Sequence, residues 1–169
     1  MIGFAKKSII ADSLGVVVND ITGNAPLGID SPTAIFGALC YFLQIYYDFS
    51  GYSDIAIGIS RMFGFKFKEN FNYPYTSLSI GEFWRRWHIS LGSWFREYIY
   101  IPLGGNRKHV YINLFIVFLI TGIWHGSTLN FVIWGIAHGI LIMIERLVRG
   151  QAWYIGLPDI FKWLFTMIF

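Results

Sequence analysis

Two long apolar runs constrain this sequence more than any other feature. They cover residues 110–124 and 131–148, and only a short polar stretch separates them. Apolar segments of about this length are typical of helices that enter or cross a lipid bilayer, whose hydrocarbon core is about 30 Å thick. Because the connection is short, we expect the two runs to form an antiparallel helical pair within a membrane.

The distribution of charge agrees with lipid as the solvent. Charged residues make up 14% of the chain and hydrophobic residues 55%, whereas soluble domains carry about 25% charged residues. The basic residues form short groups between apolar runs, which argues against the clustered basic face of a nucleic-acid-binding protein. Basic pairs lie at the outer ends of both runs, and the positive-inside rule places them together on the cytoplasmic side. These pairs are Arg107/Lys108 and Arg146/Arg149.

Further helices are expected upstream. Residues 33–47 and 54–65 are apolar, and the stretch between them is polar. Because polar groups are costly within a membrane, we expect a break there. The rest of this half predicts a weakly amphipathic stretch at residues 4–21, a turn-rich linker from Asn24 to Pro32 that contains Pro26 and Gly28, and irregular structure at residues 66–81.

Residues 80–100 have the pattern of an amphipathic helix. On a helical wheel their charged and hydroxyl side chains fall within one arc of about 140°, and aromatic and aliphatic side chains fill the opposite arc. A helix of this kind lies in the membrane interface, with its polar arc toward water or phosphates. His88 is the exception, because it falls on the apolar side among Trp84, Phe95 and Ile99.

His125 is the strongest candidate for chemistry among the four histidines. It follows the first apolar run, which as a 15-residue helix spans only about 22 Å. His125 would therefore lie within the membrane, where the following Gly126-Ser127-Thr128 breaks the helix and an ionisable residue indicates a functional site. A neutral imidazole can accept a hydroxyl proton near pH 7. The alternative is a histidine that is hydrogen-bonded but plays no chemical part.

The other candidates are weaker. His109 lies in a basic loop and is expected at the surface, and His138 lies in a GxxxG spacing and is expected to pack and bond to a neighbouring helix. His88 could orient a substrate or be a buried packing residue. A lone cysteine, Cys40, excludes an intrachain disulfide and is expected in the core. Compact metal-ligand spacings, a GxSxG elbow and a P-loop are all missing from the sequence.

Five motifs occur in order along the chain, at residues 47–58 (YDFSGYSDIAIG), 69–75 (ENFNYPY), 83–91 (FWRRWHISL), 102–107 (PLGGNR) and 124–126 (WHG). With these motifs the sequence resembles the bacterial branch of the membrane-bound O-acyltransferase family, and nearly the whole chain takes part. The PLGGNR stretch favours the subgroup of alginate O-acetyltransferase membrane subunits.

The resemblance implies an all-α, polytopic membrane protein that transfers an acyl group, here acetyl, to a hydroxyl of an exported polysaccharide or of its periplasmic partner. It makes His125 the catalytic histidine and His88 the second histidine of the site. It implies no metal and no bound cofactor, with an acyl donor such as a thioester as co-substrate. It also implies a place in the bacterial inner membrane, with the lipid bilayer, periplasmic acetylation proteins and the polysaccharide acceptor as partners.

Members of this family are longer than the present chain. We therefore expect residues 1–169 to be a single partial domain, with further N-terminal and C-terminal spans missing. Residues 160–169 form an apolar run of ten residues, and crossing a bilayer takes about 20. Two alternatives remain at this level: a transporter or channel segment whose polar residues line a permeation path, and a non-catalytic or truncated subunit without activity.

Overall fold

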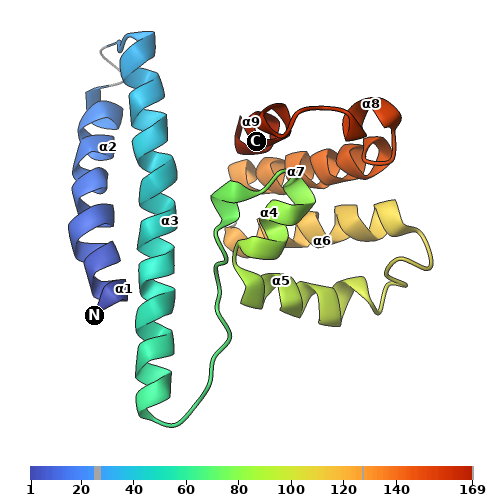
Figure 1. Cartoon of the computed structure of the whole chain (residues 1–169), viewed down its shortest axis with the longest axis horizontal. Helices are drawn as coiled ribbons and strands as arrows, with labels where there is room; N and C mark the ends of the chain where they lie inside the picture. Colours follow the sequence, from blue (N-terminus) through green and yellow to red (C-terminus); the bar gives the residue numbers. More distant parts are fainter. Residues whose placement is uncertain (25–27, 127, 169) are drawn as a thin grey trace. The chain divides into compact units, whose positions relative to one another are not determined.

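The computed structural model describes residues 1–24, 28–126 and 128–168, and every regular element within these ranges is a helix (Figure 1). This confirms the predicted all-α fold class. The chain divides into two compact units, residues 1–70 and residues 71–169, which are described separately below. The prediction of a single partial domain stays a prediction.

The first unit is a helical hairpin in which a helical segment packs along one long helix (Figure 1). The long helix α3 begins after Asp30, whose side chain accepts a hydrogen bond from the backbone N–H of Thr33. Pro32 lies in the first turn of α3, where a missing N–H is harmless, so the predicted linker ends earlier than expected. Pro26 of that linker lies outside the described residues. The elements are α1 (Ile2–Ala5), the π-helical turn η1 (Lys6–Ala11), α2 (Asp12–Asn24) and α3 (Ser31–Met62).

The predicted break within α3 was wrong, because the helix runs on through the polar stretch. Its carboxylates are paired within the unit: Lys6 Nζ lies 2.8 Å from Asp54, and Lys7 Nζ lies 2.6 Å from Asp48. A lone polar group is costly in an apolar environment, but a paired one is much less so. Cys40 is buried in the same helix, as predicted.

Small residues let the helices of this unit approach closely. Gly3 and Gly51 face each other, and a Cβ built on Gly51 would lie 2.8 Å from the carbonyl oxygen of Gly3. The neighbouring Ser50 and Ser53 are buried. The polar motif in α3 is therefore a packing surface as well as a set of ionic groups.

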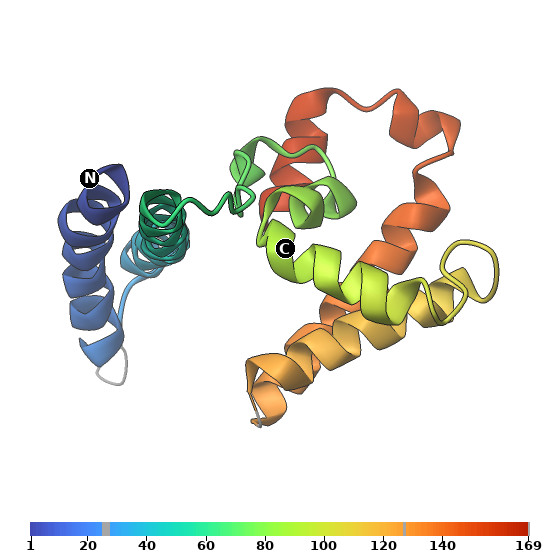
Figure 2. The same cartoon turned by 90° about the horizontal axis from the view of Figure 1, so that it is seen from below.

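An antiparallel pair of apolar helices forms the centre of the second unit (Figure 2). The helices are α6 (Val110–His125) and α7 (Leu129–Val148). Gly122 of α6 lies against Gly135 of α7, and a Cβ built on Gly135 would lie 2.6 Å from the carbonyl oxygen of Phe118. These contacts confirm the predicted antiparallel pair. By length and composition α7 can cross a membrane, whereas α6 is apolar but shorter.

The predicted continuous helix over residues 80–100 was wrong. Helix α4 (Ile80–Arg86) ends at Trp87, and α5 (Ile89–Phe95) begins only after His88, whose backbone is left-handed with φ 47° and ψ 53°. The chain then continues as a π-helical turn, η4 (Arg96–Tyr100). A wheel assumes one uninterrupted helix, so its angles do not carry across His88. Arg85 and Arg96 are nevertheless exposed, as expected.

The remaining elements border this pair. The short turn η3 (Pro74–Thr76) precedes α4 in a segment that is otherwise irregular, as predicted. At the other end of the chain lie α8 (Ala152–Ile155) and α9 (Asp159–Ile168). The indole N–H of Trp163 in α9 donates to the carbonyl of Tyr75 at 2.7 Å, so the first and last segments of the second unit are in contact.

Candidate active site

A cluster of histidine and tryptophan rings forms where α4, α6 and α7 meet. The His88 and Trp124 ring centroids lie 6.3 Å apart, and those of Trp124 and His125 lie 5.0 Å apart. The series continues from His125 to Trp134 at 5.3 Å and from Trp134 to His138 at 4.5 Å. Trp124 thus contacts both histidines that the sequence singles out. We call these five residues, with Trp84, the His–Trp cluster.

Trp84 closes the cluster from the side of α4. Its ring lies 5.4 Å from that of His138 and 5.7 Å from that of Trp134, in edge-on geometry in both cases. Its indole nitrogen is buried and has no hydrogen-bond partner among the described residues. Aromatic pairs prefer such edge-on arrangements, which hold the rings at defined angles.

His88 reaches the cluster because of the backbone at the junction of α4 and α5. Histidine is among the few residues other than glycine that are enriched in the left-handed region, which reverses the chain sharply there. The ring is half-buried, and Ser90 Oγ lies 3.4 Å from its Nδ1. Burial, and after it the nearby His125, lowers the pKa of His88 below its ordinary value. The ring therefore stays neutral at pH 7.

His125 is the last residue of α6 and is exposed on the second unit. The helix ends there as predicted, although Ser127 of the following turn lies outside the described residues. Phe131 stacks on its ring with centroids 6.1 Å apart. The exposed ring can therefore meet a substrate while aromatic neighbours fix its orientation.

His138 and His109 have different surroundings. His138 Nδ1 lies 3.0 Å from the carbonyl of Trp134, one turn earlier in its own helix. The expected hydrogen bond to a neighbouring helix stays a prediction. The predicted close helix approach at the GxxxG spacing is confirmed, since Gly135 and Gly139 are both buried. His109 is exposed, as predicted.

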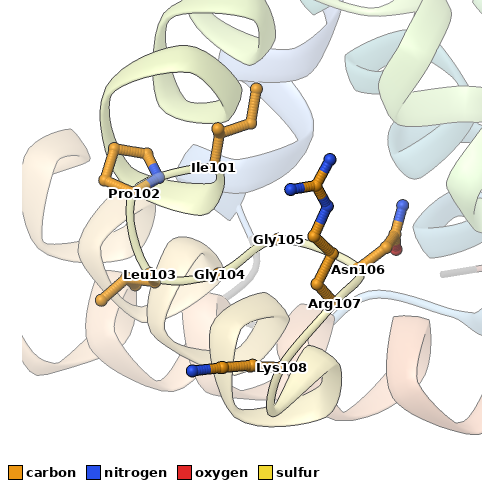
Figure 3. Close-up of a pocket in the computed structure, with 8 residues that line it drawn as sticks. All are labelled: Ile101, Pro102, Leu103, Gly104, Gly105, Asn106, Arg107 and Lys108. Atoms are coloured by element: carbon orange, nitrogen blue, oxygen red, sulfur yellow. The ribbon is translucent and has the colours of Figure 1, made fainter.

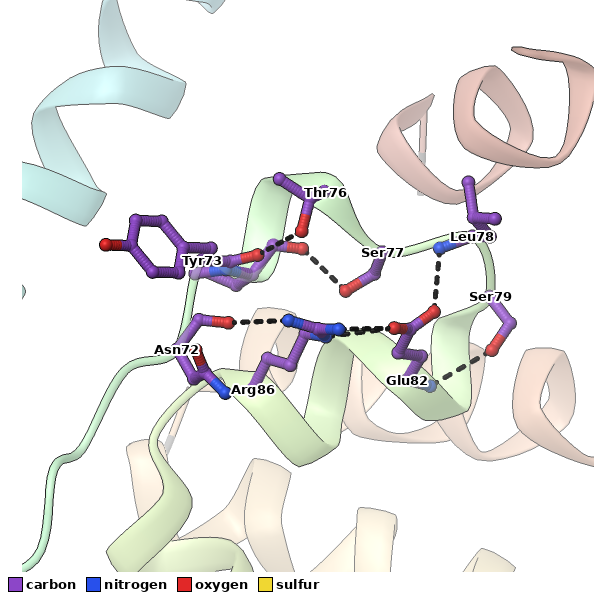
Figure 4. Close-up of polar contacts among 9 residues, drawn as sticks. Asn72, Tyr73, Thr76, Ser77, Leu78, Ser79, Glu82 and Arg86 are labelled. Carbon is purple, nitrogen blue, oxygen red and sulfur yellow. Dashed lines mark hydrogen bonds and ion pairs between the residues drawn. The ribbon is translucent and has the colours of Figure 1, made fainter. Parts of the chain in front are cut away.

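A polar network fixes the start of α4 (Figure 4). The Ser79 hydroxyl accepts from the N–H of Glu82, and a Glu82 carboxylate oxygen accepts from the N–H of Leu78 in return. Arg86 bonds to the same carboxylate at 2.8 Å and to the carbonyl of Asn72 at 3.1 Å. The Leu78 N–H first, and Arg86 after it, hold the pKa of Glu82 below its ordinary value. This reciprocal cap anchors the helix that leads to His88.

A basic loop between η4 and α6 surrounds a pocket of about 620 Å³, lined by residues 101–108 (Figure 3). Gly104 and Gly105 both have positive φ, which glycine adopts at little cost. The Asn113 side chain donates to the carbonyls of Gly105 at 3.1 Å and Lys108 at 2.7 Å. The loop is therefore held in one shape against the first turn of α6.

The structure brings both predicted site residues against the Trp124 ring, with ring centroids at 6.3 Å for His88 and 5.0 Å for His125. A cavity shared by His88 and His125 stays a prediction, as do their chemical roles. Reasoning from sequence missed the part of Trp84, Trp124 and Trp134. Trp84 and Trp124 had a sequence signal, since each lies in a motif that also contains a site histidine, whereas the contacts of Trp134 join helices and depend on the fold.

The second unit is built on a close-packed apolar helix pair, one member of which is long and apolar enough to cross a membrane, and it holds histidines among aromatic rings, as a helical membrane protein of the expected class would. The family model for membrane-bound O-acyltransferases matches residues 32–167. The chain belongs to the membrane-bound O-acyltransferase family.

Curated relatives narrow the comparison. The chain is 49% identical to a probable alginate O-acetylase AlgI of Pseudomonas putida, over 99% of this chain and 35% of that protein. It is 44% identical to the peptidoglycan O-acetyltransferase of Helicobacter pylori, over 99% of this chain and 33% of that protein. The chain is 36% identical to the teichoic acid D-alanyltransferase of Bacillus subtilis, over 83% of this chain and 38% of that protein. The chain thus spans about a third of the length of these relatives.

Proposed function

We propose that the protein to which this chain belongs is a membrane O-acyltransferase that transfers an acetyl group to a hydroxyl of an exported polysaccharide. The observation that carries the proposal is the position of His125, at the end of an apolar helix and beside the ring that also contacts His88. The names of the three relatives, which describe acyl transfer to cell-surface or secreted polymers, support the acceptor class.

The chemistry follows from what a neutral imidazole can do. A His125 ring nitrogen accepts the proton of the acceptor hydroxyl while the oxygen attacks the acyl carbonyl carbon. A new C–O bond forms, the bond to the donor's leaving group breaks, and the proton passes from His125 to that group. A neutral His88, which also contacts Trp124, orients the hydroxyl or the carbonyl by a hydrogen bond. General-base catalysis of this kind contributes about 10²- to 10⁴-fold.

Replacement of His125 tests the proposal. In the full-length protein His125→Ala is expected to lower acyl transfer by at least about 10²-fold, the lower limit for losing a general base. Membrane insertion and abundance stay near normal, because the ring is exposed on its unit. His109→Asn is the matched control, since His109 is exposed, lies outside the cluster and has a left-handed backbone that asparagine tolerates. Wild-type transfer by His125→Ala would show that His125 only packs.

The same variant separates this function from a permeation path. A transporter or channel segment would lose flux of its solute on His125→Ala and would show no acyl transfer to lose. A truncated or non-catalytic subunit would leave transfer unchanged in both histidine variants. The assay follows acetyl groups from a thioester donor to polysaccharide in membranes, with flux measured in the same vesicles.

We place the protein in the inner membrane as a multi-pass protein, with periplasmic acetylation proteins as partners. The outer ends of α6 and α7 lie together, since Arg146 of α7 donates to Asn106 in the loop before α6 at 3.2 Å. The positive-inside rule puts these ends on the cytoplasmic side. Single cysteines at positions 108 and 149 of the full-length protein are then labelled only from that side. Labelling from opposite sides would contradict the topology.

A further inference from the structure

A buried carboxylate at the end of α7 holds the helix that leads to His88. Glu145 is 7% exposed, and its Oε2 accepts a hydrogen bond from the backbone N–H of Gly81 at 2.9 Å. Gly81 is the second residue of α4, and the first turn of a helix has N–H groups without partners inside the helix. Glu145 therefore provides, from another helix, an acceptor for an N–H group at the start of α4 that has no acceptor within α4.

The fit between the two residues is tight. A Cβ built on Gly81 would lie 3.1 Å from Glu145 Oε1 and 3.6 Å from Arg85 Nη1. A side chain at position 81 could be accommodated only by moving the carboxylate. Glycine at this position is thus matched to a carboxylate at position 145.

The next residue of α7 holds the far end of the same segment. Arg146 Nη2 donates to Asn106 Oδ1 at 3.2 Å, and the hydroxyl of Tyr100 donates to the same oxygen at 2.9 Å. Residues 81 and 106 bracket α4, the His88 turn, α5 and η4. One end of α7 therefore contacts both ends of the segment that carries His88, while Trp134, three turns earlier, contacts Trp84 within α4.

We propose that Glu145 is a positioning residue, which holds the start of α4 so that His88 meets Trp124 beside His125. This inference rests on the proposed function, in which His88 takes part. Removing one partner of a buried charged hydrogen bond leaves the other uncompensated. Without Glu145 the short helix α4 can shift, and displacement of a catalytic group by about 1 Å can lower a rate by about 10²-fold.

Three variants of the full-length protein test the proposal through kcat and KM. Glu145→Ala is expected to lower kcat by about tenfold or more, with KM for the donor changed by less than about twofold, because orientation rather than binding is lost. Glu145→Gln restores most of the rate, since its amide oxygen can still accept from the Gly81 N–H. Glu97→Gln, which removes an exposed carboxylate from η4, is the matched control and keeps the wild-type rate.

A double-mutant cycle shows whether Glu145 acts through Gly81. In the presence of Glu145, the methyl group of Gly81→Ala crowds the carboxylate oxygen. In a Glu145→Ala background that oxygen is gone, so the same methyl group is accommodated. The two changes are therefore expected to combine to much less than the product of their separate effects on kcat. If the effects multiply, or if Glu145→Gln is as slow as Glu145→Ala, the proposal is overturned.

A measurement independent of acyl transfer separates this inference from the proposed function. Diethyl pyrocarbonate acylates accessible histidine rings, and mass spectrometry gives the rate at His88. We expect that rate to rise at least about twofold in Glu145→Ala, because a released α4 opens locally, and to stay unchanged in Glu97→Gln. An unchanged rate at His88 overturns the positioning role even if His125 proves catalytic. A raised rate supports it even if His125→Ala remains active.

Discussion

The two units of this chain use the same close packing of glycines but surround it with different side chains. In the first unit Gly3 meets Gly51 beside ion pairs, Lys6 with Asp54 and Lys7 with Asp48. The second unit has close glycine contacts between α6 and α7 and, on the same helices, the tryptophan and histidine rings of the His–Trp cluster. The carboxylates in the polar stretch of α3 are paired within the first unit, whereas the second unit presents an exposed histidine.

This difference indicates which side chains of the chain are available to act on a substrate. Paired charges stabilise an arrangement and have little left to offer a substrate. Imidazoles among aromatic rings remain neutral, oriented and able to exchange a proton. If this distinction is correct, the second unit is sensitive to loss of rings and to helix spacing, and the first unit tolerates loss of a single charge.

The largest effect is expected for Trp134→Ala, because Trp134 contacts His125, His138 and Trp84. Removing a largely buried tryptophan lowers the free energy of unfolding by about 3 kcal/mol. Thermal unfolding of the detergent-solubilised full-length protein measures it. The control is Trp153→Ala, which removes a 60% exposed ring and is expected to change stability by less than about 0.5 kcal/mol. Equal losses of unfolding free energy in the two variants would show that the His–Trp cluster contributes no more to stability than an exposed ring does.

A smaller loss is expected when the helices of the second unit are forced apart. Gly122→Ala places a methyl group against the carbonyl oxygen of Phe131, and overpacking of this kind costs about 1–3 kcal/mol. Gly58→Ala in α3 is the matched control, because nothing lies within 4 Å of its Cβ position. It is expected to stabilise by about 0.5–1 kcal/mol, as alanine does in place of a helical glycine. Changes of opposite sign in the free energy of unfolding of the two variants would show that the close glycine contact, and not the substitution itself, destabilises the second unit.

The smallest effect is expected for the ion pair of Lys6 with Asp54 in the first unit. Its two side chains are 26% and 29% exposed, and pairs near water contribute about 0.2–1 kcal/mol. A double-mutant cycle of Lys6→Ala and Asp54→Ala is expected to give a coupling free energy in this range, which falls as salt is raised. A coupling free energy larger than the stability loss of Trp134→Ala would reverse the contrast between the units.

Some of this fold could be predicted from the sequence because the signals are local. The apolar runs of α6 and α7 and the glycine spacing at residues 135 and 139 fix the pair, and the end of α6 at His125 follows from the length of the run and the break after it. The motifs around His88 and His125 identified the family.

Other features depend on partners distant in sequence. The carboxylates in the polar stretch of α3 pair with Lys6 and Lys7 of another element, and the local sequence around α3 does not show these partners. The contact of Glu145 with Gly81 joins residues 64 positions apart. The turn at His88 is a left-handed backbone at a residue other than glycine, and a helical wheel contains no term for it.

The backbone at His88 has a consequence for how its role can be measured and for which residues can replace it. With φ at 47°, the position is strained for alanine, so His88→Ala removes the ring and also unsettles the bend. Asparagine is enriched in that conformation and glycine adopts it freely. His88→Asn and His88→Gly are therefore the cleaner chemical deletions. Because a single nucleotide change converts a histidine codon into one for asparagine or aspartate, which also adopt this conformation, the bend at position 88 can persist where the ring is lost.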